Sequence, residues 1–301
     1  LDEATARRQL VARGMLENID FAFVDATWLQ AWGMTDGQVA LANPLSAELA
    51  VMRPSLLPGL VAALGRNVAR QAGRVRAFEL GRVFHAPAVA GEPPQETRRI
   101  AAAVCGDALA LQWGVASRKV DFHDIKGDLE ALAAASGARL SLVPSAPAHA
   151  HPGRSADVLR DGVRIGWIGQ LHPSLVDALD IGAEVYAFEL ELDALLVREL
   201  PQADQISRFP STRRDLAFLV PDGVNWADLR ATALAAGGEL LRDVVLFDRY
   251  VGPGVEPGHT SLAMGLILQH ASRTLTDADI DPVVNAAVAA VEAQHRARMR
   301  A

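Results

Sequence analysis

The last third of the chain carries strand and helix patterns in an order that few folds accommodate. Alternating runs predict strands, and apolar residues at helical spacing predict helices. The predicted order is strand 215–220, helix 226–236, strand 240–251, strand 260–270, helix 277–293 and a last alternating segment, 295–300. This βαββαβ order is that of the ferredoxin-like split βαβ motif. We therefore expect one four-stranded sheet with two helices.

The first two thirds of the chain mix helices and strands without a βαβα rhythm. Asp161-Gly162 lies between two alternating runs and predicts a hairpin, and 121–137 predicts a capped helix that ends at a glycine. The almost wholly apolar run 100–106 predicts a strand buried on both faces. The other predicted strands are 17–24, 75–85, 156–159, 163–170 and 184–192, and the other predicted helices end at Gly14 or cover 60–69 and 175–179. The pattern favours an antiparallel sheet with helices, an α+β fold.

A polar segment with prolines at both ends, 200–210, separates the two regions. It has little hydrophobic periodicity, which is typical of a linker. A chain of 301 residues is long enough for about two domains. We expect one domain over 1–205 and a second over 208–301.

The amino-acid composition excludes several classes of protein. A hydrophobic content of 50% excludes a disordered chain, and the single cysteine, Cys105, excludes a disulfide scaffold and a multi-cysteine zinc site. Cys105 lies in an apolar strand pattern and is expected to be an inert core thiol. No long uncharged apolar run predicts a membrane span, and 1–14 does not resemble a secretory signal. We expect a cytoplasmic protein and, since the chain begins at Leu1 rather than Met, a processed product or a piece of a longer one.

Several polar clusters could suggest a metal or catalytic site, and each has a simpler structural interpretation. His149 and His151 lie in a loop with prolines, and His123 and His172 supply no helical pair of ligands. The glycines of 252–258 join two predicted strands, whereas a phosphate-binding loop joins a strand to a helix. We therefore predict no metal site and no catalytic residue in this chain.

Two clusters in the last third point to RNA. Arg213 and Arg214 stand where the linker enters the first strand, and Phe247-Asp248-Arg249-Tyr250 ends another strand of the same predicted sheet. An exposed aromatic ring beside a carboxylate and an arginine is what recognition of single-stranded RNA uses. An ion pair beside a half-buried ring explains the same residues equally well, so both interpretations stay open at this point.

Ten segments along nearly the whole chain resemble the C-terminal part of the bacterial phenylalanine–tRNA ligase β-subunit family. In chain order they are NPLS (43–46), MRPSLLPGL (52–60), FELGRVF (78–84), DIKGD (124–128), HPGRSA (151–156), GWIGQLHP (166–173), FPSTRRDLA (209–217), FDRY (247–250), GHTSLA (258–263) and RTLT (273–276). Because so many motifs occur in order and at suitable spacing, the resemblance is specific.

The resemblance implies that 1–205 form a degenerate copy of a class II synthetase catalytic domain, built on an antiparallel sheet. A class II active site needs arginines for the phosphates of ATP. The strand 78–84 reads Phe-Glu-Leu-Gly-Arg where the family of active enzymes has Phe-Arg-x-Glu, and 184–196 have neither glycine nor arginine. Without those cations the charge that develops on the phosphate is not stabilised. We expect no adenylation by this chain alone, whereas ATP and magnesium are implied for the whole enzyme.

The resemblance also implies that 208–301 form a ferredoxin-fold anticodon-binding domain. Matched position by position, Ala217, Asp248, Tyr250 and Ser261 would contact the anticodon, with Tyr250 stacking on a base. Arg213, Arg214 and Arg249 are possible further RNA contacts. From Arg208 onward the formal net charge is −1, against −7 for the whole chain, so binding would depend on a few placed residues rather than a basic surface.

The partners implied are the catalytic α subunit, in an α2β2 heterotetramer, and phenylalanine transfer RNA, with no membrane. Two other readings remain. One is a stand-alone ferredoxin-like RNA-binding or regulatory protein without a synthetase role. The other is a purely architectural subunit, whose degenerate domain serves only its interface.

Overall fold

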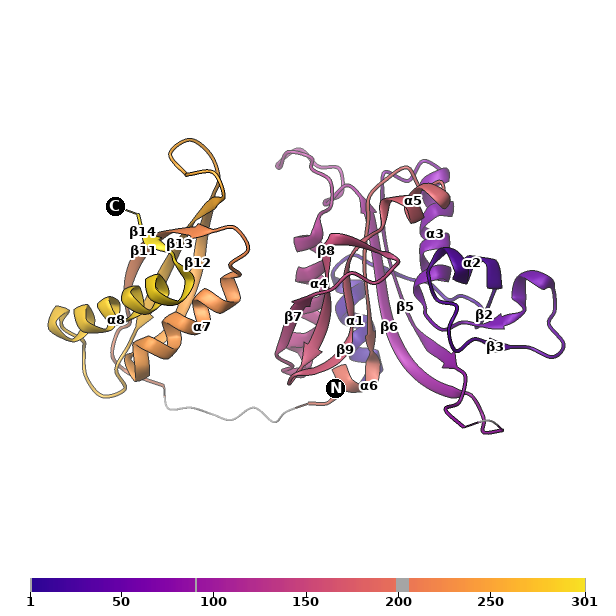
Figure 1. Cartoon of the computed structure of the whole chain (residues 1–301), viewed down its shortest axis with the longest axis horizontal. Helices are drawn as coiled ribbons and strands as arrows, with labels where there is room; N and C mark the ends of the chain where they lie inside the picture. Colours follow the sequence, from indigo (N-terminus) through magenta and orange to yellow (C-terminus); the bar gives the residue numbers. More distant parts are fainter. Residues whose placement is uncertain (1, 90, 199–205, 301) are drawn as a thin grey trace. The chain divides into compact units, whose positions relative to one another are not determined.

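The computed structural model describes residues 2–89, 91–198 and 206–300. The chain forms two compact units, Leu1–Pro201 and Gln202–Ala301 (Figure 1). The segment in which the sequence predicts the domain boundary includes 199–205, and these lie outside the described residues.

The first unit is built on a seven-stranded sheet with the order β1-β5-β6-β10-β9-β8-β7. Its strands are β1 (Leu16–Glu17), β5 (Arg74–His85), β6 (Gln95–Gly106), β7 (Leu140–Pro144), β8 (Ala150–Arg160), β9 (Val163–Leu171) and β10 (Val185–Glu191). Neighbouring strands are antiparallel, except that β1 runs parallel to β5. The antiparallel α+β layout predicted from the sequence is confirmed.

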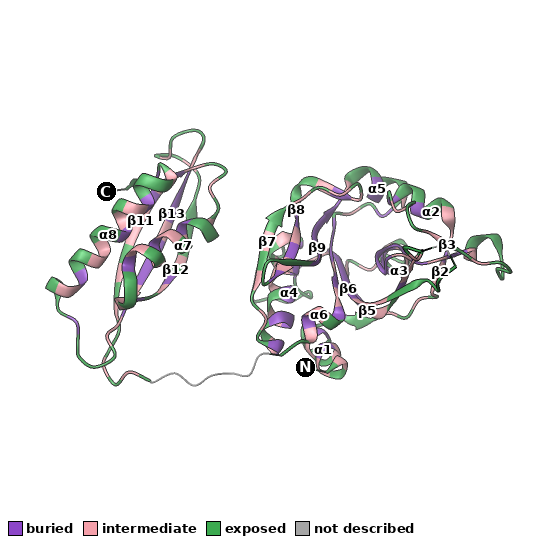
Figure 2. Cartoon of the chain, turned by 60° about the horizontal axis from the view of Figure 1, so that its bottom comes forward, coloured by how far each residue is buried: buried purple, intermediate pink, exposed green. Residues whose placement is uncertain are grey.

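Helices cover both faces of this sheet (Figures 1 and 2). Helices α1 (Glu3–Ala12), α4 (Phe122–Ser136) and α6 (Leu192–Leu196) share one core with it, and α3 (Leu57–Ala69) and α5 (Pro173–Ala178) share the other. A small sheet in the order β2-β4-β3 lies beside α2 (Ala26–Ala31). Its strands are β2 (Phe23–Val24), β3 (Val39–Ala40) and β4 (Val51–Met52), and a 3₁₀ turn, η1 (Ala47–Leu49), precedes β4.

The apolar run in β6 explains how the sheet can be buried on both faces. Ile100, Ala102 and Val104 belong to the core that contains α4, whereas Ala101, Ala103 and Cys105 belong to the core that contains α3. All six are at most 1% exposed, so the predicted burial on both faces is confirmed. Burial also raises the pKa of the Cys105 thiol to about 11, as expected of an inert core thiol.

Two local predictions are confirmed in detail. The Asp121 side chain accepts hydrogen bonds from the first backbone amides of α4, Asp124 closes a capping box, and Gly137 ends the helix with φ of 75°. Asp161 and Gly162 both have positive φ, 51° and 80°, as a type I′ turn between β8 and β9 requires.

The predicted strand 17–24 is wrong in its middle. The segment divides into β1 and β2. The pairing of β1 with β5 ends at the Asn18 backbone amide, which donates to the Phe78 carbonyl at 2.7 Å, and the Asp20 backbone amide donates to a side chain, Glu79 Oε1, at 3.4 Å. Strand β6 begins earlier than predicted, at Gln95, because it is paired along its length with β5. Strand β8 begins at Ala150, which pairs with Leu171 before an irregularity that ends at Ser155. The predicted loops 86–97 and 144–152 are correspondingly shorter.

The second unit has the predicted βαββαβ order. It runs β11 (Thr212–Pro221), α7 (Trp226–Gly237), β12 (Leu241–Tyr250), β13 (His259–Leu268), α8 (Asp277–His295) and β14 (Arg298–Met299), with a 3₁₀ turn, η2 (Gly238–Leu240), before β12. The sheet order is β12-β13-β11-β14, and every neighbouring pair is antiparallel. This is the ferredoxin-like arrangement.

Candidate nucleic-acid interface

The sheet of the second unit has its two helices on one side (Figure 1). Leu216, Phe218 and Val220 of β11 point into the core with α7 and α8. Because side chains alternate along a strand, Arg213 and Ala217 point to the opposite side. We call this opposite side, formed by β11 to β14, the open face, since no helix of this unit covers it within the described residues.

The four residues matched to anticodon contacts lie together on the open face. In the strand register Ala217 is opposite Ala263, which is opposite Asp248. One row further on, Leu219 is opposite Ser261, which is opposite Tyr250. Residues opposite one another share a face of the sheet, so all four lie in two adjacent rows.

A β-bulge in β12 determines which side chains reach this face. Val244 and Leu246 point into the helix-covered core, so an undisturbed strand would turn Asp248 and Tyr250 into the core as well. The register shifts between Leu246 and Asp248, where Phe247 is the extra residue. The bulge thereby moves Asp248 and Tyr250 to the open face, as bulges commonly do beside functional sites.

Two arginines lie across the open face and reach aromatic rings on β12. Arg300 follows β14, and its backbone amide donates to the Ala217 carbonyl at 2.7 Å. Its guanidinium donates to Ser261 Oγ at 3.3 Å and lies 5.9 Å from the centre of the Tyr250 ring. The Arg213 guanidinium lies 4.8 Å from the centre of the Phe247 ring. These distances are those of cation–π pairs.

The position of Tyr250 depends on the loop that follows it. Its hydroxyl donates to the Pro253 carbonyl at 3.2 Å, and a Cβ at Gly252 would lie only 2.7 Å from that hydroxyl. The ring is nevertheless 38% exposed, so one side remains available for stacking. This glycine loop therefore supports the ring, in agreement with the hairpin reading of 252–258.

Arg214 and Arg249 lie on the other side of the sheet. Arg214 alternates with Arg213 and donates to Asp277, in the first turn of α8, at 2.5 Å. Arg249 is opposite Leu262, a core residue. The sequence reasoning did not single out Arg300, although arginines at alternate positions 296, 298 and 300 were a usable signal.

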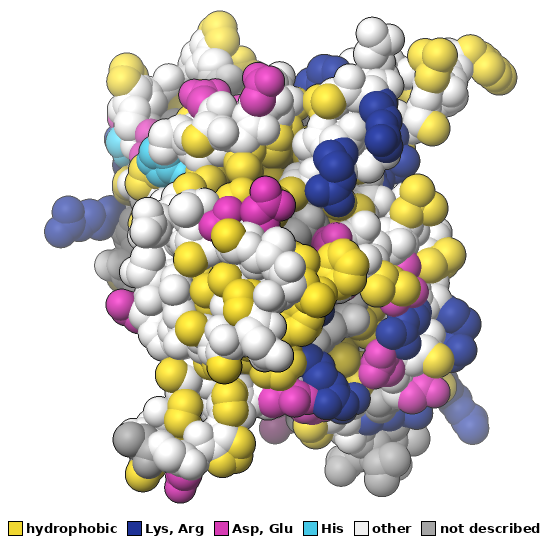
Figure 3. Space-filling model, turned by 90° about the vertical axis from the view of Figure 1, so that its right-hand side faces the viewer, with side chains coloured by type: hydrophobic (Ala, Val, Ile, Leu, Met, Phe, Trp, Pro, Cys, Tyr) yellow, Lys and Arg dark blue, Asp and Glu magenta, His cyan; other side chains and the backbone are white. Residues whose placement is uncertain are grey.

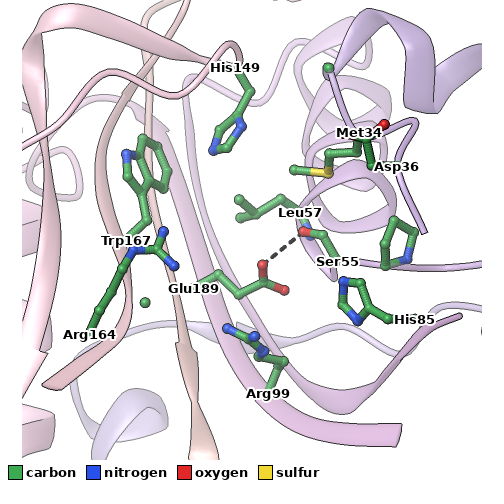
Figure 4. Close-up of a pocket in the computed structure, with 13 residues that line it drawn as sticks. Met34, Asp36, Ser55, Leu57, His85, Arg99, His149, Arg164, Trp167 and Glu189 are labelled. Atoms are coloured by element: carbon green, nitrogen blue, oxygen red, sulfur yellow. Dashed lines mark hydrogen bonds between the residues drawn. The ribbon is translucent and has the colours of Figure 1, made fainter. Parts of the chain in front are cut away.

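A cavity of about 250 Å³ in the first unit occupies the sheet face beside α3 (Figure 4). Glu189 lies in its wall and accepts hydrogen bonds from Ser55 Oγ at 2.9 Å and from the Leu56 amide at 2.7 Å. Burial raises the pKa of Glu189, an effect that the Arg99 guanidinium opposes. His149 packs edge-on against Trp167, with ring centres 4.9 Å apart. Burial and the Arg164 guanidinium lower the pKa of His149 to about 4, so its imidazole is neutral at pH 7.

These residues do not fit the triphosphate of ATP. The cations of the cavity are matched by carboxylates: Arg164 pairs with Asp157 at 2.8 Å and Arg99 with Glu191 at 3.4 Å. In the strand 78–84, Glu79 pairs with the buried Arg53 at 2.7 Å, and Arg82 pairs with Glu96.

No group of three or more histidine, cysteine or acidic side chains is placed to hold a metal ion in the part of the chain that the structure describes. Nor is any helix there both long and apolar enough to cross a membrane.

Comparison with known proteins identifies both units. The model of the phenylalanyl tRNA synthetase beta chain CLM domain matches residues 2–192, and that of the ferredoxin-fold anticodon binding domain matches residues 207–300. Among solved structures, PylSc, a pyrrolysyl tRNA synthetase of Desulfitobacterium hafniense, shares 18% identity over 64% of each chain, with a TM-score of 0.48.

Curated relatives match over the full chain. The phenylalanine–tRNA ligase beta subunits of Xanthomonas oryzae pv. oryzae (strain MAFF 311018) and Xylella fastidiosa (strain Temecula1 / ATCC 700964) are 67% and 60% identical over 300 residues. The match covers 100% of this chain and 38% of each relative. The chain therefore belongs to the phenylalanine–tRNA ligase beta-subunit family.

Proposed function

We propose that this chain is the C-terminal region of a phenylalanine–tRNA ligase β subunit and supports the ATP-dependent charging of phenylalanine transfer RNA. In this proposal the second unit binds the anticodon and the first packs on the catalytic α subunit, within an α2β2 heterotetramer in the cytoplasm. The proposal rests mainly on one observation. Four residues lie together on the open face: Ala217, Asp248, Tyr250 and Ser261.

The chemistry of the open face suits an unpaired RNA base. Ala217, Ser261 and Ala263, which lie beside Tyr250 and Asp248, have small side chains, and the Arg300 side chain lies over Ser261. Tyr250 supplies a stacking surface, and Asp248 can accept a hydrogen bond from the edge of a base. Arg300 adds a cation beside the ring for a phosphate. Of the possible RNA contacts, we retain Arg213 and leave out Arg214 and Arg249, which lie on the helix-covered side.

An exposed apolar segment of the first unit suits a protein partner. Leu16, Ile19 and Phe21 are 77%, 88% and 70% exposed around the edge strand β1. Arg53 holds the backbone at the end of this segment. Its guanidinium donates to the Phe21 carbonyl at 3.5 Å, and its backbone amide donates to the Ala22 carbonyl at 2.9 Å. Rigid, exposed apolar side chains at a sheet edge are typical of an interface. Figure 3 shows another face of this unit, where β2, β3 and α2 lie, with hydrophobic and oppositely charged side chains interspersed.

A stand-alone RNA-binding or regulatory protein is the second candidate. It would use the same open face, but it gives no reason for a first unit that matches the CLM family model over residues 2–192. The synthetase proposal accounts for both units and is therefore favoured.

We expect this chain to catalyse no phenylalanine-dependent exchange of pyrophosphate into ATP. Arg99 and Arg164, which line the cavity of the first unit, are paired with carboxylates, so in this proposal ATP and magnesium are bound by the α subunit. The assay is incorporation of labelled pyrophosphate by the purified chain, with the whole ligase as the positive control. Exchange that depends on phenylalanine would overturn the degenerate interpretation of this unit.

Tyr250→Ala in the complete ligase is expected to raise the KM for transfer RNA and to leave kcat nearly unchanged. Stacking on an aromatic ring contributes about 1–3 kcal/mol per base, so KM should rise roughly 5- to 150-fold. The measurement is charging of phenylalanine transfer RNA at increasing RNA concentration, with Met299→Ala as the control. Met299 is also exposed but lies opposite Phe218, on the helix-covered side. An unchanged KM in the Tyr250 variant would count against anticodon binding by this face.

A further inference from the structure

Phe247 is a second aromatic ring on the RNA-facing side of β12, and the proposed function does not use it. It is the extra residue of the β-bulge and is 49% exposed. An apolar ring of this size would normally be buried, and the core of the unit lies on the opposite side of the same sheet. The exposed ring beside Arg213 is therefore available to contact a ligand on the open face.

Two features of the sheet hold the Arg213 side chain beside this ring. Asp215 accepts a hydrogen bond from its Nε at 2.6 Å, and the guanidinium then lies 4.8 Å from the centre of the Phe247 ring. To reach β12 from β11, the side chain must cross the middle strand, β13. It crosses at Gly265, where a Cβ would lie 2.7 Å from Arg213 Nε. The glycine thus provides the space that Arg213 occupies.

The same arrangement occurs at the other end of the open face. There Arg300 crosses from β14 to the Tyr250 ring and donates to Ser261 on the way. The two arginine–aromatic pairs start from the neighbouring strands β11 and β14 and end on one strand, β12, where Asp248 lies between Phe247 and Tyr250 in the sequence. Each pair offers an aromatic ring on which a base can stack. The Arg213 guanidinium is paired with Asp215, so its part is to hold a cation beside the Phe247 ring rather than to bind a phosphate.

We propose that Phe247 and Arg213 form a second base-stacking position, which holds the nucleotide adjacent to the one on Tyr250. This inference rests on the proposed function, because the occupant is the single-stranded loop of transfer RNA. Three residues of strand separate the rings by roughly 10 Å, which is wider than the spacing of stacked bases. The two bases must therefore be splayed apart, as in the recognition of RNA loops. Exposed aromatic rings beside polar groups favour unpaired RNA bases over an apolar protein segment.

The test uses the full chain and an anticodon stem-loop RNA that carries 2-aminopurine at one loop position at a time. Stacking on an aromatic ring quenches 2-aminopurine, so the experiment reports stacking as well as affinity. The proteins compared are the native chain, Phe247→Ala, Phe247→Tyr, Tyr250→Ala and the control Met299→Ala. The thermal unfolding of each variant is measured first, and we expect it to be unchanged because Phe247 and Tyr250 lie outside the core.

We expect quenching at two neighbouring loop positions in the native chain and in Met299→Ala. Phe247→Ala should lose the quenching at one of these positions and bind the stem-loop roughly 5- to 150-fold more weakly. Phe247→Tyr keeps an aromatic ring and should retain the native affinity and the quenching at both positions. Tyr250→Ala should lose the quenching at the other position. If Phe247→Ala binds and quenches like the native chain while Tyr250→Ala is impaired, the second position is refuted and the proposed function stands. If neither substitution has an effect, or if the native chain does not bind the stem-loop, both are refuted.

Discussion

Asp128→Ala is expected to lower the free energy of unfolding of the first unit by about 3–5 kcal/mol. Asp128 lies on α4 and is 1% exposed. One of its carboxylate oxygens accepts from Arg13 Nε at 2.6 Å, and the other accepts from Arg76 on β5. It therefore joins the end of α1, the sheet and α4. Removing it leaves the Arg76 guanidinium buried without a counter-ion, beside Arg74, whose pKa is lowered by burial and by the Arg76 charge.

Urea unfolding followed by tryptophan fluorescence measures this effect, because four of the five tryptophans lie in the first unit. Asp193→Ala is the matched control: its ion pair with Arg98 is exposed, and we expect a loss of about 1 kcal/mol or less. The double variant Arg76→Met, Asp128→Leu should recover most of the loss, since it removes the buried charge together with its partner. If Asp128→Ala and Asp193→Ala lower the free energy of unfolding by the same amount, the buried ion pairs of Asp128 do not hold the helices to the sheet.

The stability of the first unit is expected to fall as the pH drops from about 6.5 to 4, and His149 should account for about 3 kcal/mol of that fall. The pKa of His149 is lowered to about 4 by burial and by Arg164, so the folded state excludes a proton that the unfolded state accepts. The contribution is complete above the ordinary histidine pKa and is lost as the pH falls towards the folded value. Its physical cause is the burial of the imidazole, which packs against Trp32 and Trp167 with ring centres 6.0 and 4.9 Å away. Figure 4 shows His149 beside Trp167 in the cavity wall.

The measurement compares urea unfolding of the native chain and His149→Gln between pH 7 and pH 4. The difference in unfolding free energy between the two proteins should move by about 3 kcal/mol in favour of the variant as the pH falls. Burial also raises the pKa of Glu189 and lowers that of His85, but both groups are present in both proteins and cancel in the difference. A difference that does not change with pH would mean that the pKa of His149 is the same in the folded and the unfolded state.

The architecture could be predicted from the sequence because local signals and burial agree. The βαββαβ order, the Asp161-Gly162 turn and the two-sided burial of β6 each follow from patterns within about a dozen residues. The segment 17–24 was mispredicted because Asn18 and Asp20 bond to residues about 60 positions away, and no local pattern carries that information.

The open face was predictable only in part. Family motifs led to Ala217, Asp248, Tyr250 and Ser261, but strict alternation from Leu246 would have turned Asp248 and Tyr250 into the core. The bulge at Phe247 corrects this, and a bulge is set by pairing with β13 rather than by the sequence of β12 alone. The two arginines were not separated for a different reason: the predicted strand 215–220 begins after them, whereas β11 begins at Thr212, and its alternation places Arg213 on the open face and Arg214 beside Asp277 behind the sheet.

The central claim is that the open face of the second unit binds the anticodon, and the affinity of the chain for an anticodon stem-loop tests it most directly. Dissociation constants are measured for the native chain and Tyr250→Ala at one fixed salt concentration, since phosphate contacts make such affinities depend on salt. The account predicts specific binding by the native chain and a roughly 5- to 150-fold loss in the variant. Equal affinities for the two proteins would contradict it.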